Sequence, residues 1–196
     1  MEIKPNQVAL KSLQLNIDFA HAGIIEETGN NDGALIDRVE KIWGLEGEPY
    51  CTMGQYYVAA KAVAFINGIK LTESNIVSAA KNLKSGIFEE YVYFHPACAE
   101  MITIALKNRM YVPFDSSTDR WKIMPGDYVF FDFGTPAKPQ RHVGQFIQLV
   151  GDNLKLVEWN TTPPKKTKEE SNGGVFIKDR EPDPDVILGW IRANRS

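Results

Sequence analysis

The sequence has few cysteines and few histidines, and this scarcity excludes several classes of protein. Its 196 residues include two cysteines, Cys51 and Cys98, and three histidines. Two cysteines allow at most one disulfide, so the chain is not a small scaffold held together by disulfides. A structural zinc site needs at least two short pairs of ligands, and only His95 and Cys98 make one. We therefore expect neither a metal site nor a cofactor.

Excess positive charge and long apolar runs are also missing. The formal net charge is -3 without a long basic stripe, whereas dedicated nucleic-acid binders normally cluster Lys and Arg. No apolar stretch approaches the ~20 residues that span a bilayer. The first residues, 1–5, lack the basic segment and apolar run of a secretory signal. We expect no nucleic-acid partner, no membrane span, and synthesis in the cytoplasm without a signal peptide.

The pattern of apolar residues changes from helical to β character along the chain. Recurrence at three- and four-residue steps predicts helices over residues 5–28, 33–43, 51–66, 73–83 and 97–107. Aromatic and β-branched runs predict strands over residues 127–133, 142–150, 154–160, 175–177 and 186–191. This order predicts an α+β fold in which N-terminal helices pack on a C-terminal antiparallel β-sheet. We expect one domain over residues 1–196, with a helical part at 1–45 and an exposed loop at 161–174.

Cys51 lies at a predicted helix start, which is a chemically distinctive place for a thiol. Pro49 comes just before it and suits the first turn of a helix, where its missing N–H is not needed. The positive end of the helix dipole lowers the pKa of a thiol there, and the thiolate is the nucleophile. The N–H groups of that turn can also face a developing oxyanion. Because free cysteines usually only pack in cores, this position alone does not establish catalysis.

His142 begins a predicted hairpin that brings polar side chains to one face. If the turn consists of residues 151–153, Gly144 lies opposite Asn160. His142, Glu158 and Asn160 then project from the same face, since strand side chains alternate. We expect Asn160 to be the direct partner that orients the His142 ring, with Glu158 opposite Phe146 and farther along the strand. A two-residue turn would put His142 and Asn160 on opposite faces.

Several segments of the sequence occur in the same order as the motifs of a known family. The segments that carry the likeness are Gly29–Gly33 with Ile36 and Asp37, Gly47–Cys51, Met124–Phe131, His142–Gly144, Val157–Asn160, and Gly173–Val175 leading to Val186–Ile191. The chain resembles the CHAP domain, a papain-like family of cysteine- and histidine-dependent amidohydrolases and peptidases, frequent in bacterial and phage wall hydrolases. The likeness covers most of residues 26–192. It implies a papain-like fold with Cys51 as nucleophile and His142 as base.

The resemblance also implies a substrate. It is peptidoglycan, cleaved at an amide bond through an acyl-enzyme on Cys51, by an N-acetylmuramoyl-L-alanine amidase or a peptidoglycan endopeptidase. The enzyme would then act at the cell wall after release or export. Two alternatives share the fold: a non-catalytic wall-binding or virion structural protein, and an injected antibacterial effector.

The supporting residues follow from the same resemblance. Glu158 and Asn160 are expected to support the histidine. Tyr50, Asn31 and Trp159 are expected to contact substrate. Tyr50 stands where the family often has Trp, and Trp159 where it usually has glycine, so these departures bear on the shape of the substrate.

Two other features receive structural interpretations. The loop at 30–33 resembles calcium loops, and some CHAP domains bind calcium, but it lacks the first acidic ligand and the terminal Glu of an EF-hand. We expect a turn there, with Asp32 capping the next helix. Cys98 follows Pro96 and lies near His95 in sequence, yet lacks the family motif. We interpret it as a packed core cysteine.

Overall fold

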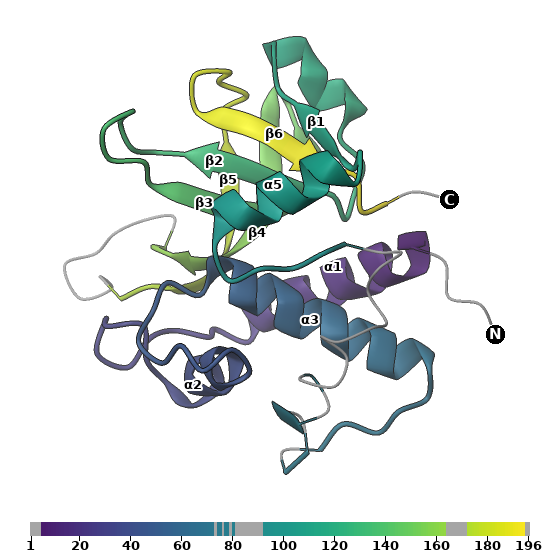
Figure 1. Cartoon of the computed structure of the whole chain (residues 1–196), viewed down its shortest axis with the longest axis vertical. Helices are drawn as coiled ribbons and strands as arrows, with labels where there is room; N and C mark the ends of the chain where they lie inside the picture. Colours follow the sequence, from purple (N-terminus) through teal and green to yellow (C-terminus); the bar gives the residue numbers. More distant parts are fainter. Residues whose placement is uncertain are drawn as a thin grey trace.

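Helices come first and strands last in the computed structural model, which describes residues 5–72, 74–75, 77–78, 80, 92–163 and 172–194 (Figure 1). The helices are α1 (Pro5–His21), α2 (Ala34–Lys41), α3 (Cys51–Ile66), α5 (Cys98–Lys107) and the 3₁₀ helix η1 (Ser117–Lys122). The strands are β1 (Tyr111–Pro113), β2 (Tyr128–Asp132), β3 (Arg141–Val150), β4 (Asn153–Thr161), β5 (Gly174–Arg180) and β6 (Ile187–Ile191). The predicted α+β class is confirmed.

Several element boundaries differ from the prediction. Helix α1 ends at His21 rather than at residue 28, because the chain turns at Gly23 with a φ of 69°. Asp32 does not cap α2; its carboxylate accepts hydrogen bonds from the backbone and hydroxyl of Thr28. Asp37, inside α2, accepts instead from the Gly33 N–H. The helix predicted over 73–83 and the loop predicted over 161–174 fall mostly outside the described residues.

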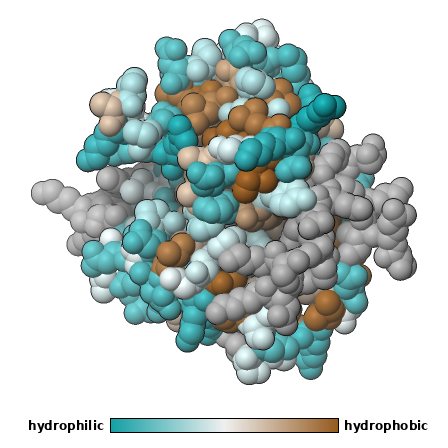
Figure 2. Space-filling view, in the orientation of Figure 1, coloured by the Kyte–Doolittle hydropathy of each residue, from teal (hydrophilic) through white to brown (hydrophobic). Residues whose placement is uncertain are grey.

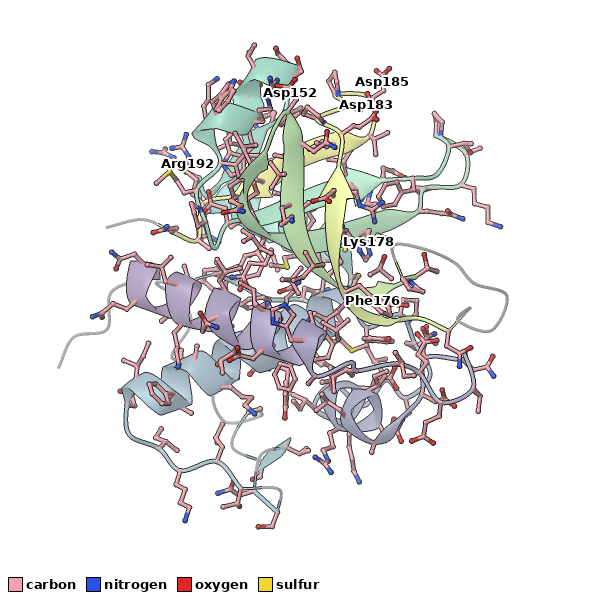
Figure 3. All side chains as sticks on the ribbon, turned by 180° about the vertical axis from the view of Figure 1, so that it is seen from behind. Asp152, Phe176, Lys178, Asp183, Asp185 and Arg192 are labelled. Carbon is pink, nitrogen blue, oxygen red and sulfur yellow. The ribbon has the colours of Figure 1, made fainter. Side chains whose placement is uncertain are left out.

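The six strands form one antiparallel sheet in the order β1-β6-β2-β3-β4-β5. The sequence did not predict β1 or η1, because a three-residue strand ending in Pro113 is too short for an alternating pattern. Arg120 of η1 binds Asp152 in the β3–β4 turn at 2.7 Å, which ties η1 to one end of the sheet (Figure 3). Seen from behind, α1 crosses the other end, below Phe176 and Lys178 of the edge strand β5 (Figure 3).

Helix α3 is buried on nearly all sides, and it packs against both α1 and the sheet. It approaches the sheet closely at Gly54, where an added Cβ would lie 2.2 Å from the Trp159 ring. A polar network fixes this approach: the Asn16 amide donates to Gln55 of α3 (2.7 Å) and Gln145 of β3 (2.6 Å), and accepts from Trp159 Nε1. Because Gln55 is one turn after Cys51, the network sets the helix start against β3.

The surface carries some exposed apolar residues. Hydrophobic residues are concentrated over α5 and the strands beside it on the face shown in Figure 2, where polar residues interrupt them. Leu106 of α5 is one of these exposed side chains. Within the described residues, no helix has the length and apolar character needed to cross a membrane.

Candidate active site

The β3–β4 hairpin has a different register from the predicted one. Val150 pairs with Asn153, so the turn has two residues, Gly151 and Asp152, rather than three. A β-bulge at Ile147 then adds one residue to β3 and shifts the pairing. The prediction of a three-residue turn was therefore wrong, but the bulge compensates for the change of face that a two-residue turn would cause.

The shifted register gives His142 a different partner from the predicted one. Gly144 lies opposite Glu158, not Asn160, and His142 Nε2 lies 3.0 Å from Glu158 Oε2. The prediction that Asn160 is the direct partner was wrong, as was the pairing of Glu158 with Phe146. Gly144 leaves the room that Glu158 needs, since a Cβ there would lie 2.9 Å from the Glu158 Cγ.

Glu158 is a fully buried carboxylate that binds Arg180 in addition to His142. Arg180 of β5 donates from Nε to Oε1 at 2.8 Å and from Nη2 to Oε2 at 2.6 Å. Burial alone would raise the pKa of Glu158, but hydrogen bonds from Arg180 and then His142 outweigh it and lower that pKa to about 2. The sequence did not predict a role for Arg180, because the strand expected over 175–177 ends before it, whereas β5 extends to Arg180. Its guanidinium also lies over the Phe133 ring, 4.8 Å from the centroid.

Cys51 is the first residue of α3, as predicted, and the interaction of its sulfur with His142 lowers the pKa of the thiol. Since Nε2 of His142 faces Glu158, Nδ1 is the nitrogen left for the sulfur. The Thr52 N–H, in the same first turn, lowers the pKa of the thiol as well. Glu158, His142 and Cys51, from three elements, thus interact one after the other.

The charges in this chain stabilise each other. Burial would lower the pKa of His142, but its hydrogen bonds with Cys51 and Glu158 raise it to about 9. The hydrogen bond with Cys98 is the largest cause that lowers the pKa of Cys51, and His142 lowers it further. Burial acts in the opposite direction but is outweighed. At neutral pH the pair is therefore a thiolate and an imidazolium, the reactive form of a cysteine nucleophile.

Cys98 lies in the same site, which the sequence did not predict. Its Sγ is 3.7 Å from the Cys51 Sγ, and both thiols are buried and free. Cys98 begins α5 as Cys51 begins α3. The hydrogen bond to Cys51, together with burial, raises the pKa of the Cys98 thiol, so it donates to the Cys51 thiolate. Two cysteines that both follow a proline at a helix start were the only sequence signal for this pairing.

Two hollows open on either side of Cys51. They share a rim made of four residues, Pro49, Cys51, Pro139 and Arg141. The hollow toward α5 measures about 500 Å³, and its remaining lining is mainly apolar: Leu45, Met53, Pro96, Ala97, Cys98 and Ala99, with Glu48. The other measures about 770 Å³ and is polar: Gln140, His142, Asn160, Thr161, Thr162 and Arg180, with Phe133. Together they provide room for an extended chain on both sides of the sulfur.

The residues predicted to contact substrate do not share one location. Tyr50 and Trp159 have no exposed surface: the Tyr50 hydroxyl donates to Glu26 at 2.9 Å, and Trp159 packs on α3. Neither side chain can contact a substrate, because the core encloses both. Asn31 donates to the Gly47 carbonyl and so supports the loop before Cys51. Asn160, with a φ of 54°, lines the polar hollow without pairing with His142.

Among the described residues, no three His, Cys, Asp or Glu side chains are grouped closely enough to hold a metal ion. Comparison of the chain with protein-family models, with curated proteins and with solved structures found no match. The chemistry of the site is therefore inferred from its own residues and geometry, and its substrate from the resemblance to the CHAP domain.

Proposed function

We propose that the protein is a cysteine hydrolase that cleaves amide bonds in peptidoglycan. The observation that carries the proposal is the chain of Glu158, His142 and Cys51, with the thiol at a helix start. A thiolate, an imidazolium and a buried carboxylate in this order are the groups that acyl transfer needs. A non-catalytic protein has no evident need for a buried ion pair aimed at a thiol between two hollows.

The chemistry follows from the positions of these groups. The Cys51 thiolate attacks the amide carbonyl, and N–H groups of the first turn of α3 stabilise the oxyanion. His142 donates its Nδ1 proton to the departing nitrogen as the C–N bond breaks, leaving an acyl group on Cys51. A water molecule then attacks the thioester while His142 removes its proton. Glu158 stays ionised throughout and stabilises the imidazolium.

The linings of the two hollows support one orientation of the proposed substrate. The general acid must lie on the side of the leaving amine, and His142 lines the polar hollow. The acyl half then lies in the apolar hollow, against Leu45, Met53 and Pro96. Small apolar residues such as alanine, which recur in peptidoglycan stems, suit this lining. Arg141, at the shared rim, suits a stem carboxylate on either side.

Digestion of purified peptidoglycan tests the proposal. Wild-type protein and Cys51→Ala are incubated with sacculi of both amidated and non-amidated chemotypes, and the soluble products are analysed by liquid chromatography and mass spectrometry. New amino groups on L-alanine indicate the amidase, and new termini within stem or cross-bridge indicate the endopeptidase. We expect products with the wild type alone.

The alternatives give different results in the same assay. If wild-type protein sediments with sacculi but releases no product from any chemotype, a wall-binding protein replaces the hydrolase. If it cleaves an unrelated peptide such as a casein fragment faster than sacculi, the cysteine chemistry stands and the peptidoglycan assignment falls. Equal activity of the wild type and Cys51→Ala overturns the nucleophile.

A further inference from the structure

Cys98 is not the nucleophile, the base or the supporting carboxylate of the proposed hydrolytic cycle, although it lowers the pKa of Cys51. Yet its sulfur is 3.7 Å from the nucleophile. The two helix starts are tied together, because the Thr52 hydroxyl donates to the Pro96 carbonyl. A disulfide needs an S–S separation of ~2.05 Å, so the sulfurs must approach by about 1.7 Å. Rotation about the two Cα–Cβ bonds moves the sulfurs through distances of this size.

We propose that Cys98 is a resolving cysteine that captures oxidised Cys51 as an intramolecular disulfide, so that a hydroperoxide inactivates the enzyme reversibly. Small oxidants have a route, since both cysteines line the apolar hollow. The substrate of the enzyme does not enter this inference, which needs only the Cys51 thiolate and its neighbour.

The steps balance with hydrogen peroxide as the oxidant. The Cys51 thiolate attacks one peroxide oxygen, the O–O bond breaks, and the departing hydroxide takes a proton to become water. Cys51 is then a sulfenic acid. The Cys98 sulfur attacks the Cys51 sulfur, the S–O bond breaks, and the released hydroxide takes the Cys98 proton. Two thiols lose two electrons and two protons, and one peroxide becomes two waters.

The first step also activates the second. In the reduced site, the hydrogen bond to Cys51 is the largest cause of the raised pKa of Cys98, and the negative charge of Cys51 adds to it. A neutral sulfenic acid removes that charge. Arg141 still favours the Cys98 thiolate. Cys98 is thus held as a thiol while Cys51 is reduced and becomes easier to ionise once Cys51 is oxidised, which is the order a resolving cysteine needs.

Peptide mass analysis of the whole chain tests this. The reduced protein is treated with hydrogen peroxide, free thiols are blocked with N-ethylmaleimide, and the protein is digested with trypsin. Cleavage after lysine places Cys51 in peptide 42–61 and Cys98 in peptide 85–107. We expect the two peptides joined within one molecule, about 2 Da lighter than their sum, and released by dithiothreitol with both thiols restored.

Two variants sharpen the test. In Cys98→Ser, we expect Cys51 to gain about 32 Da as sulfinic acid at least tenfold faster than in the wild type. In Cys51→Ser, we expect Cys98 to stay reduced. The proposal is overturned if wild-type Cys51 becomes sulfinic while Cys98 still takes up maleimide, or if the disulfide joins two molecules. These measurements use no substrate, so their outcome does not depend on whether the protein hydrolyses peptidoglycan.

Discussion

His142 Nε2 lies 3.0 Å from Glu158 Oε2, so the histidine is supported by a charge and not by an amide. An asparagine can orient an imidazole, but a carboxylate also stabilises its protonated form. Arg180 keeps that carboxylate ionised although it is fully buried. The site is therefore built to hold an imidazolium beside Cys51 over a wide range of pH.

Glu158→Gln separates the charge from the orientation. Activity should require the imidazolium, so the alkaline limb of the wild-type pH profile should fall near the His142 pKa of about 9. The variant keeps a hydrogen-bond partner but loses the charge, so we expect this limb to shift down by about one unit or more. The measurement is the rate of hydrolysis from pH 5 to 10, because this rate depends on the His142 proton whereas alkylation depends on the thiolate alone.

Asn160→Gly is the matched control for that experiment. Asn160 has a φ of 54°, a conformation that glycine adopts without strain, so the variant removes the side chain and keeps the backbone. Because His142 is hydrogen-bonded to Glu158 and not to Asn160, we expect the alkaline limb of this variant to match the wild type. A shift in Asn160→Gly with none in Glu158→Gln would return the supporting role to Asn160.

Iodoacetamide should label Cys51 much faster than Cys98 at pH 6 to 7. The lowered pKa of Cys51 makes it the thiolate, while the raised pKa of Cys98 keeps that sulfur protonated. We expect a difference in labelling rate of roughly tenfold or more. Peptide mapping of samples taken over time measures this difference. Faster labelling of Cys98 would move the nucleophile to α5.

Glu40 should make stability depend on pH. Its buried carboxylate accepts from the Gly47 N–H, and burial raises its pKa from 4.5 to about 7. The folded state therefore holds a proton that the unfolded state releases near pH 4.5, so stability falls as pH rises from about 4.5 to 7. We expect Glu40→Gln to lose less stability between pH 5 and 8, by on the order of 1 kcal/mol in urea unfolding. Parallel curves for the two proteins would contradict this.

Gly54→Ala should destabilise the protein although alanine favours helices. The new Cβ would lie 2.2 Å from the Trp159 ring, and overpacking of this kind costs about 1–3 kcal/mol. Thermal unfolding measures the loss. Replacing Trp159 by the smaller Phe makes room for the new Cβ. The double variant should therefore lose less stability than the sum of the losses of the two single variants. Additive effects would place the strain elsewhere.

A chelator should leave hydrolysis unchanged. Asp32, the acidic residue of the loop at 30–33, is already hydrogen-bonded to Thr28, which lowers its pKa and stabilises the loop itself. The measurement is turnover after dialysis against EDTA. Loss of activity that added calcium restores would make the loop a metal site after all.

The sequence by itself determined that helices precede the sheet and that Cys51 begins a helix. Helix periodicity, and a proline two residues before the cysteine, are local signals, and they placed the start of α3 correctly. These predictions needed only the conformation of each segment and its nearest neighbours. The shared face of His142 and Glu158 was predicted from a three-residue turn, and it was kept only because the bulge at Ile147 offsets the two-residue turn.

Only the tertiary structure decided which groups meet. The bulge at Ile147 moved the register so that Glu158 rather than Asn160 contacts His142, and a bulge depends on packing across the sheet, not on the local sequence. Arg180 reached Glu158 from another strand, and Cys98 reached Cys51 from another helix, each after a connection whose path the sequence does not encode locally. Contacts between distant segments depend on how whole elements pack, and that packing is set by the complete core.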